Sequence, residues 1–433
     1  MKVTFIKPNF ADIRSSDAMQ PLVFAILAGL TPTDIEIHFM DDRIEEISFD
    51  ESTDLVALTV ETHTAKRAYQ IAARYRKAGI PVIMGGFHPT LMPDEVSTYA
   101  DSVVIGDAEH VWNKVLSDVK AGRLQRIYRG DSASPLTGLK VDRRIFDHKR
   151  YSIMVPVQYG RGCRYACDFC CIHKFYGRSI RQRPINEVIS EVEGIGKKWI
   201  LFIDDNLFAD GKEIKKFIEA LIPLHIRWTC QISIDAAADT DLIKLMSKSG
   251  CKAVLVGFES FNEHNLKMMN KIQNLRHQNY AAVIQKFKDH GIMVYGTFLF
   301  GYDHDTVESF DMTVDFALKT KLCLANFNPL FPLPGTALYD RLKAEDRLIH
   351  EKWWLSPDYT YGQAHFHPRG MTALQLTEKC FEARQKFNTY RSILSRGVDL
   401  KANLRCPVNF FIYLSANLIS RKEIYQKQGI SLG

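Results

Sequence analysis

The stretch GRGCRYACDFC, residues 160–170, contains three cysteines, Cys163, Cys167 and Cys170, separated by three and two residues. Thiolates are the usual ligands of iron–sulfur clusters, and a cubane 4Fe–4S cluster has four irons. Three thiolates leave one iron without a protein ligand, and that iron can bind a substrate or cofactor, as the open position of a catalytic metal site does. The spacing predicts one loop around three corners of a cluster, and the two glycines before the first cysteine let the backbone turn tightly.

Three other interpretations of these cysteines remain open, and chance clustering of buried cysteines is the least favoured of them. A structural zinc site would need a fourth ligand, such as Cys171 or His173, but zinc sites usually pair two distant C-x-x-C arms, and the sequence contains no second arm. A redox pair of Cys167 and Cys170 would leave Cys163 without a role and lacks a thioredoxin-like setting. The spacing favours a cluster, and a non-enzymatic iron–sulfur or zinc-binding regulator is the alternative from another class.

Length and composition limit the class of protein. The chain has 433 residues, of which 46% are hydrophobic, and this length predicts two or three domains. The net charge of +6 is small, and no dense run of Lys and Arg indicates a nucleic-acid partner. Nine cysteines, four of them between residues 163 and 171, do not form a disulfide scaffold, so we expect a reducing, cytoplasmic location.

The cysteine loop directly follows the first strand of an alternating pattern. Apolar runs and helical stretches alternate from residue 151 to about residue 365, which predicts six βα units and a partial α/β barrel. Such barrels place their chemistry at the carboxyl ends of the strands, where this loop lies. The predicted strands are Ile153–Tyr159, Trp199–Asp204, Trp228–Ile234, Ala253–Phe258, Met293–Phe300 and Leu324–Leu330, and the predicted helices include Ile185–Lys197, Lys212–Leu221, Asp241–Lys248 and Tyr280–Lys288.

Residues 1–130 show a second alternating pattern, which predicts a separate parallel sheet with helices on both faces. Parallel sheets of this kind bind ligands at the carboxyl ends of their strands. The predicted strands are Val3–Ile6, Ile35–Met40, Leu55–Val60, Pro81–Met84 and Ser102–Ile105, and the residues that follow them include Glu61, Thr62, Gly85, Gly86, His88 and Gly106.

Two further regions complete the predicted architecture. Residues 131–150 are polar and lack a clear period, so we interpret them as a linker. Residues 366–433 are predicted to be helical, with a long amphipathic helix over Thr372–Leu394. The apolar tail Asn403–Ile419 has basic residues on both sides, and it either packs on the barrel mouth, which we favour, or lies on a membrane surface. Its apolar run is too short to span a bilayer.

The cysteine loop and several strand ends resemble the radical S-adenosylmethionine family. Residues 160–170 resemble the family's signature for a 4Fe–4S cluster, with the three cysteines as ligands. The segments Ile203–Asn206, Gly257–Ser260 and Gly296–Gly301 resemble its motifs near the methionine, ribose and adenine parts of S-adenosylmethionine. The resemblance implies that this cofactor is contacted by Phe169, Asp204, Asp205, Ser233, Glu259, Gly296, Phe298 and Gly301.

The N-terminal part resembles the cobalamin-binding domain that many of these enzymes carry. The likeness rests on Gly85–Thr90 and Gly106–Glu109, and it implies a Rossmann-like domain. The sequence departs from the common motif Asp-x-His-x-x-Gly, whose His binds cobalt from below, because Pro8–Ile13 stands in its place. The resemblance implies cobalamin contacts at Glu61, Thr62, Gly85, Gly86, His88 and Gly106.

The resemblance covers nearly the whole chain and implies an enzyme. In such enzymes the open iron chelates S-adenosylmethionine, and an electron from the cluster cleaves it to a 5′-deoxyadenosyl radical, which takes a hydrogen atom from an unactivated carbon. We expect cobalamin-dependent methylation of that carbon, with a cobalamin-independent rearrangement, cyclisation or oxidation as the alternative. We also expect a small-molecule or lipid-like substrate and an electron donor such as flavodoxin or ferredoxin. The sequence alone predicts no further catalytic residue.

Overall fold

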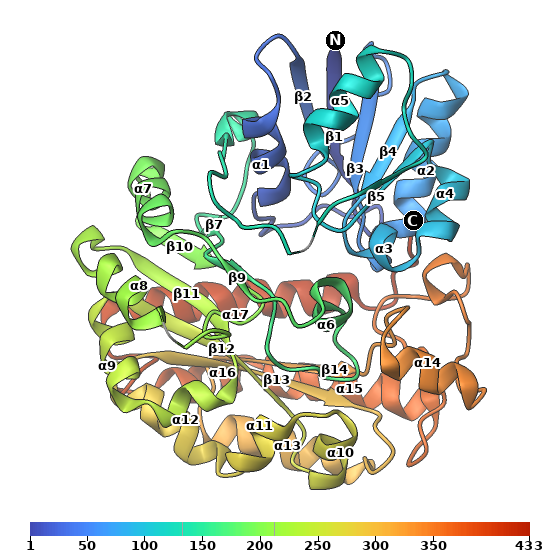
Figure 1. Ribbon diagram of the computed structural model, residues 1–433. Coiled ribbons are helices and arrows are strands. Elements are labelled where there is room, and N and C mark those ends of the chain that lie inside the picture. The colour runs from blue at the N-terminus through green and yellow to red at the C-terminus, as the bar shows by residue number, and fades with distance from the viewer. Residues whose placement is uncertain (132, 212) are drawn as a thin grey trace.

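The computed structural model describes residues 1–131, 133–211 and 213–433, and it contains two parallel six-stranded sheets (Figure 1). Residue 132 of the predicted linker and residue 212, where the sequence predicts the start of a helix, lie outside the described residues. Helices cover both sheets and also form the C-terminal region. The predicted α/β class, with a first sheet domain, a partial barrel and a helical C-terminus, is confirmed.

The first sheet has the strand order β2-β1-β3-β4-β5-β6, and neighbouring strands are parallel. The sequence predicts its first five strands, whereas the sixth has only three residues, which is too short to show a period. The strands are β1 (Lys2–Lys7), β2 (Glu36–Asp41), β3 (Leu55–Thr59), β4 (Val82–Gly85), β5 (Ser102–Ile105) and β6 (Ile127–Arg129).

Helices pack on both faces of this sheet because alternate strand residues point to opposite faces. Leu55 and Ala57 belong to a core with Trp112, on the side of α1 and α5, whereas Val56 and Leu58 belong to a second core on the side of α2. The helices are α1 (Leu22–Leu30), α2 (Ala65–Lys77), α3 (Phe87–Leu91), α4 (Pro93–Tyr99) and α5 (Trp112–Lys120), with a 3-10 turn, η1 (Thr62–Thr64), after β3.

The second sheet has the order β14-β13-β12-β11-β10-β7, and its neighbouring strands are also parallel. Within the described residues its first and last strands do not pair, so the barrel is partial. The strands are β7 (Val155–Val157), β10 (Trp199–Phe202), β11 (Arg227–Ile232), β12 (Cys251–Glu259), β13 (Met293–Phe300) and β14 (Leu324–Pro329). The short pair β8 (Gly160–Arg161) and β9 (Arg181–Gln182) is antiparallel and brackets the cysteine loop.

Helices between these strands cover one face of the second sheet, as the predicted βα alternation requires (Figure 1). The longer ones are α7 (Ile185–Ile195), α8 (Ile214–Leu221), α9 (Thr240–Lys248), α12 (Tyr280–Asp289) and α13 (Glu308–Lys319). The shorter elements are α6 (Cys171–Tyr176), α10 (Glu263–Met268), α11 (Ile272–Arg276), α14 (Ala337–Ala344), η3 (Ile222–Leu224), η4 (Ile234–Ala238) and η5 (Trp353–Leu355).

Three C-terminal helices, α15 (Ala373–Phe387), α16 (Tyr390–Gly397) and α17 (Pro407–Lys427), pack against the barrel. The single long helix predicted over Thr372–Leu394 is wrong, because the chain breaks there and Thr389 caps a new helix by accepting a hydrogen bond from the N–H of Ser392. Helix α17 crosses behind the second sheet (Figure 1), and Asn417 donates to the carbonyl oxygen of Cys323 at 3.0 Å. The tail therefore packs on the barrel.

Of the segment predicted as a linker, residues 131–150, the described residues 133–150 fold back on the first sheet. It contains a 3-10 turn, η2 (Arg143–Phe146), and the N–H of Asp142 donates to the carbonyl oxygen of Ala25 at 2.8 Å. Phe146 is buried with its ring centre 5.3 Å from that of Phe39. One aromatic side chain thus anchors a stretch whose composition is mostly polar.

Candidate functional site

Two aspartates that follow β10 hold the turn from which the cysteine loop begins. Asp204 accepts hydrogen bonds from the backbone N–H groups of Tyr159, at 3.1 Å, and Gly160. Asp205 accepts a hydrogen bond from the N–H of Gly162 at 2.8 Å. Burial raises the pKa of Asp204 to about 7, and the two backbone donors oppose that shift. Both oxygens of Asp204 accept hydrogen bonds from the loop, so this carboxylate positions the loop, and its contact with S-adenosylmethionine stays a prediction.

The three thiols lie on this loop beside a cation. Cys163 Sγ is 3.8 Å from the side-chain nitrogen of Asn206. Burial raises the pKa of the Cys167 and Cys170 thiols to about 12, and the ammonium group of Lys271 opposes the shift at both. Thiols bind metals as thiolates, so the positive charge of Lys271 favours the form that ligates.

The spacing of possible ligands bears on the kind of metal centre. Among the described residues, no three Cys, His, Asp or Glu side chains lie close enough to share one metal ion. A zinc site gathers thiolates at about 2.3 Å from a single ion, whereas each cysteine of a 4Fe–4S cluster binds a separate iron. Three thiols with spacings of three and two residues on one loop can each bind a separate iron of such a cluster.

A buried ion pair lies next to the thiols. Lys271 Nζ donates to Glu259 Oε1 at 2.5 Å, and both side chains are buried. A Cβ on Gly257 would lie 2.2 Å from Glu259 Oε1, so this glycine leaves the room that the pair needs. Lys271 Nζ also lies 5.6 Å from the centre of the Phe169 ring. Sequence reasoning singles out Glu259 but misses Lys271, because helix α10 separates the two residues in the chain.

Asn206 joins the ends of β10 and β11. Its Nδ2 donates to Ser233 Oγ at 3.0 Å, and its Oδ1 accepts a hydrogen bond from the Ser233 N–H at 3.2 Å. The side chain of Asn206 therefore connects Ser233 to Cys163. Together with Phe169 and Glu259, it remains a predicted contact of S-adenosylmethionine.

Three residues of the predicted adenine segment face the core. Phe298 is 0% exposed, and its ring centre lies 5.7 Å from those of Phe258 and Phe327. A Cβ on Gly296 would lie 2.8 Å from Leu322 Cδ1, and a Cβ on Gly301 would lie equally close to buried side chains. The side chain of Phe298 therefore packs in the core, and the contacts of Gly296, Phe298 and Gly301 with S-adenosylmethionine stay predictions. The intervening residue Leu299 instead lines a cavity of about 180 Å³ beside Glu259.

An interdomain cavity of about 390 Å³ lies between the first sheet and the cysteine loop. Glu61 lies at its wall, and the Lys7 ammonium, 2.6 Å away, lowers the pKa of that carboxyl group. Gly86 has φ of +112°, and a Cβ there would lie 2.9 Å from the carbonyl oxygen of Val60, so the backbone faces the cavity without a side chain. The residues that line this cavity include Met19, Glu61, Gly86, Gly106, Arg161 and Phe175.

Half of the residues that the sequence predicts to contact cobalamin line this cavity. Three of the predicted cobalamin contacts, Glu61, Gly86 and Gly106, line it, and Gly85 lies one residue deeper, beneath α1. Phe87 of α3 and Phe175 of α6 bring their ring centres within 4.7 Å and form an apolar wall between the two sheets. No histidine is among the described residues that line it.

Thr62 and His88, which are also predicted to contact cobalamin, do not line the interdomain cavity. His88 is 0% exposed, and its Nδ1 lies 3.3 Å from Thr62 Oγ1 while its Nε2 lies 3.2 Å from Glu95 Oε1. Glu95 also accepts a hydrogen bond from the indole of Trp354 at 2.8 Å. Both ring nitrogens of His88 are thus used in a buried network that joins the first domain to η5.

Arg161 ties the cysteine loop to the first domain. Its guanidinium lies 3.1 Å from Asp107 and 2.5 Å from Glu109, and all three side chains are buried. Burial opposes the charge of Arg161, but the two carboxylates outweigh it and raise its pKa. Arg181 adds a second contact to Asp107 at 2.7 Å. The loop that carries the cysteines is therefore fixed from both domains.

We expect Arg161→Gln to lower the free energy of unfolding by about 3–5 kcal/mol, because the buried carboxylates of Asp107 and Glu109 then lose the positive charge that pairs with them. Arg164 provides a matched control three residues away, since its ion pair with Asp235 is partly exposed, and Arg164→Gln should cost less than about 1 kcal/mol. Denaturant unfolding of both variants measures the difference. Equal losses would show that Arg161 contributes no more than a surface pair.

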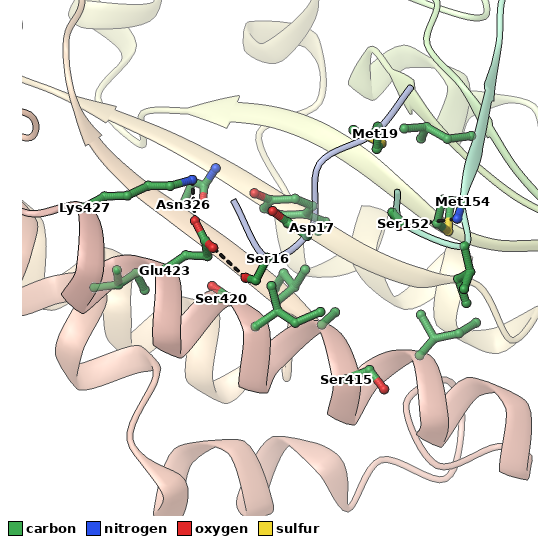
Figure 2. Close-up of a pocket in the computed structure, with 18 of the residues that line it drawn as sticks. Ser16, Asp17, Met19, Ser152, Met154, Asn326, Ser415, Ser420, Glu423 and Lys427 are labelled. Atoms are coloured by element: carbon green, nitrogen blue, oxygen red, sulfur yellow. Dashed lines mark hydrogen bonds and ion pairs between the residues drawn. The ribbon is translucent and has the colours of Figure 1, made fainter. Parts of the chain in front are cut away.

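A second cavity, the α17 cavity, has a volume of about 700 Å³ and lies on the concave side of the barrel sheet. Its walls are the inward residues of β10, β13 and β14, the segments 16–19 and 151–154, and one face of α17 (Figure 2). Met19 lines both this cavity and the interdomain cavity, so the two adjoin. The residues that line the α17 cavity include Met19, Met154, Trp199, Tyr295, Arg384, Ala416, Glu423 and Lys427.

Comparison with known families gives two matches along the chain. Residues 157–317 match the radical SAM superfamily, and residues 23–116 match the B12 binding domain. The first match contains the cysteine loop and strands β10 to β13, and the second contains the strand ends that line the interdomain cavity.

Three relatives illustrate the likeness. The bacteriochlorophyllide d C-12(1)-methyltransferase of Chlorobaculum tepidum is 32% identical over 92% of this chain and 89% of its own length. The hopanoid C-2 methylase of Rhodopseudomonas palustris is 25% identical over 77% of this chain and 66% of its own length. The solved structure of the radical S-adenosylmethionine methyltransferase TsrM from Kitasatospora setae, with cobalamin and a [4Fe-4S] cluster bound, has the same fold. It aligns with a TM-score of 0.64 at 16% identity, over 89% of this chain and 81% of that one.

Proposed function

This protein belongs to the radical SAM superfamily and carries a B12-binding domain, and we propose that it is a cobalamin-dependent methyltransferase acting on an unactivated carbon. The main support for the proposal is that a single cavity is lined both by the cysteine loop and by the edge of the first sheet. Arg161, two residues before Cys163, and Gly86, at the edge of the first sheet, line the same interdomain cavity. A carbon radical formed beside the cysteine loop would then arise next to the methyl carrier.

The roles of individual residues follow from their positions. Cys163, Cys167 and Cys170 would hold the 4Fe–4S cluster, and Asp204 and Asp205 fix the turn before them. When bound, the cluster supplies the electron that cleaves S-adenosylmethionine, and cobalamin supplies the methyl group.

Contacts to the two organic cofactors would come from different walls. Phe169, Ser233 and Glu259 lie beside the cysteine loop and would bind S-adenosylmethionine, with Asp205 as a further candidate. Glu61, Gly86 and Gly106 would bind cobalamin from the first sheet. The described lining of that cavity has no histidine, which supports cobalamin without an imidazole ligand from the protein.

The relatives suggest a substrate class. The methyltransferase of Chlorobaculum tepidum, whose name gives bacteriochlorophyllide d as its substrate, matches over more of the chain and at higher identity than the hopanoid methylase. We therefore propose a tetrapyrrole rather than a polycyclic lipid as the methyl acceptor. The α17 cavity, at about 700 Å³, is in the size range of sites for small molecules and cofactors.

Anaerobic turnover tests this function. The reconstituted chain, given S-adenosylmethionine, methylcobalamin, dithionite and bacteriochlorophyllide d, should form 5′-deoxyadenosine and a tetrapyrrole heavier by one CH₂ group. Omission of methylcobalamin should remove the methylated product. A product without an added methyl group would favour a cobalamin-independent rearrangement, cyclisation or oxidation, and methylation of a hopanoid in place of the tetrapyrrole would overturn the substrate class.

Two partners belong to the same proposal. A reduced flavodoxin or ferredoxin would supply the electron in the cell, because the chain needs an external donor.

Within the described residues, no helix has the length and apolarity required to cross a membrane. Exposed apolar and basic side chains near the C-terminus would support peripheral contact with an anionic membrane surface; they are Tyr390, Arg391, Leu394, Val398, Leu400, Lys401 and Lys422.

A further inference from the structure

A buried arginine lines the α17 cavity without a carboxylate partner. Arg384, on α15, is 7% exposed. Its Nε donates to the carbonyl oxygen of Cys380 and one Nη donates to the side chain of Gln428, both at 3.2 Å. Among the described residues no carboxylate forms an ion pair with it, and its Nη1 has no hydrogen-bond partner. A buried charge without a counter-ion is costly, so this site favours an anion from outside the chain.

Other cations of this region are already compensated. Lys427 pairs with Glu423 at 2.5 Å, and Ser16 donates to the same carboxylate at 2.7 Å, as the dashed lines of Figure 2 show. Arg396 is more deeply buried than Arg384, but its donors reach the carbonyl oxygens of Leu322 and Cys323 at 2.9 Å and further oxygens around it. Arg384 differs from these two cations, because its Nη1 has no hydrogen-bond partner among the described residues.

The cavity has a polar end and an apolar end. Figure 2 shows Lys427, Glu423 and Asn326 on one side and Met19 and Met154 on the other. Arg384 belongs to the polar end, because its partner Gln428 directly follows Lys427 in the chain. Met19 belongs to the end that adjoins the interdomain cavity.

Aromatic and aliphatic side chains form the walls between these ends. Trp199 and Tyr295 come from the sheet, and the cavity face of α17 adds Phe411 and Ile419. Flat apolar walls suit a flat apolar ligand, and aromatic rings contribute more than their area when they stack. A ligand with a rigid ring and one carboxylate would match both ends of the cavity.

We propose that the α17 cavity binds the methyl acceptor, and that Arg384 pairs with a carboxylate of that acceptor and directs its distal edge toward Met19. This inference rests on the proposed function for the identity of the acceptor, but the cavity and its unpaired cation are independent of it. The expected ligand class is a flat, largely apolar ring that carries a carboxylate side chain. The carbon to be methylated then lies at the edge remote from the carboxylate, beside the interdomain cavity.

Binding of bacteriochlorophyllide d and of its methyl ester to the full chain tests the pairing, with quenching of tryptophan fluorescence as the readout. The wild type should bind the free acid at least about thirtyfold more tightly than the ester, because only the acid pairs with a buried charge. Arg384→Gln should weaken binding of the acid by a similar factor and should leave the ester unchanged. Arg391→Gln, an exposed arginine in the same region, is the matched control and should bind both forms as the wild type does.

A second variant tests the cavity and does not depend on Arg384. Ala416→Phe places a ring inside the α17 cavity and should weaken the acid and the ester alike. Equal binding of both forms by the wild type, failure of the acid to bind, or unchanged binding by Ala416→Phe would each overturn the proposal. Turnover separates it from the proposed function: Arg384-dependent binding without methylation contradicts the function alone, whereas methylation that Arg384→Gln leaves intact contradicts the pairing alone.

Discussion

Cys163→Ala is expected to lower formation of 5′-deoxyadenosine below detection, a loss of more than about three orders of magnitude, or ~4 kcal/mol in barrier height. Cys163 is the first ligand of the predicted cluster, and the loop offers no spare thiol at its position. With two cysteines left, a second iron would lose its ligand, and the cluster would be held too weakly to cleave S-adenosylmethionine. The measurement is chromatography of anaerobic reactions, together with iron content and visible absorption of the reconstituted chain.

Cys171→Ala is the matched control for this prediction. Cys171 lies next to Cys170 and is likewise partly exposed, but it stands outside the spacing of three and two residues and begins helix α6. We expect this variant to keep its iron and its activity within about threefold, since a free cysteine behaves as a small apolar side chain. Loss of iron in Cys171→Ala, with retention in Cys163→Ala, would assign the cluster to a different set of thiols.

Lys271→Met is expected to destabilise the chain by about 3–5 kcal/mol, because it leaves the Glu259 carboxylate buried without its cation. It should also weaken binding of the cluster, since the ammonium group opposes the rise in pKa of both Cys167 and Cys170. Thermal unfolding of the chain before reconstitution measures the first effect, and iron retention during gel filtration measures the second.

The double variant Lys271→Met, Glu259→Gln separates these two effects. It removes both buried charges, so it should recover most of the stability but not the iron retention. Lys244→Met serves as a control, because Lys244 pairs with Asp241 on the surface and its loss should not be measurable. If the double variant regained full iron retention, the role of Lys271 would be only to neutralise Glu259.

Much of the fold could be predicted from the sequence because both sheets are parallel and buried. Strands such as Leu55–Thr59 and Met293–Phe300 appear as short apolar runs between helices, and the structure confirms them. The break between α15 and α16 was harder to predict, because the apolar period continues across Thr389 and only the cap shows where a new helix begins. Strand β6 could not be predicted, because its three residues show no apolar pattern and only their pairing with β5 identifies them as a strand.

The site could be predicted only in part, for a physical reason. Position in the sequence indicates which strand end a residue follows, but not which way its side chain points. Phe298 and His88 follow strands of the correct sheets, yet both point into the core. Lys271 and Arg384 depend on contacts made across helices, and no local pattern shows them. The glycines at strand ends were easier, because a backbone that lines a cavity leaves no room for a side chain.

Arg161 connects the cysteine loop to Asp107 and Glu109 of the first domain. This bridge couples binding of a ligand in the interdomain cavity to binding of iron by the loop. A ligand that stabilises the docked arrangement from the interdomain cavity also stabilises the loop in its anchored form. We therefore expect occupancy of that cavity and retention of iron by the loop to strengthen each other, and thermodynamic reciprocity makes the two factors equal. Cells that lack corrin would then yield protein poor in iron as well, and the two cofactor contents would rise and fall together across preparations.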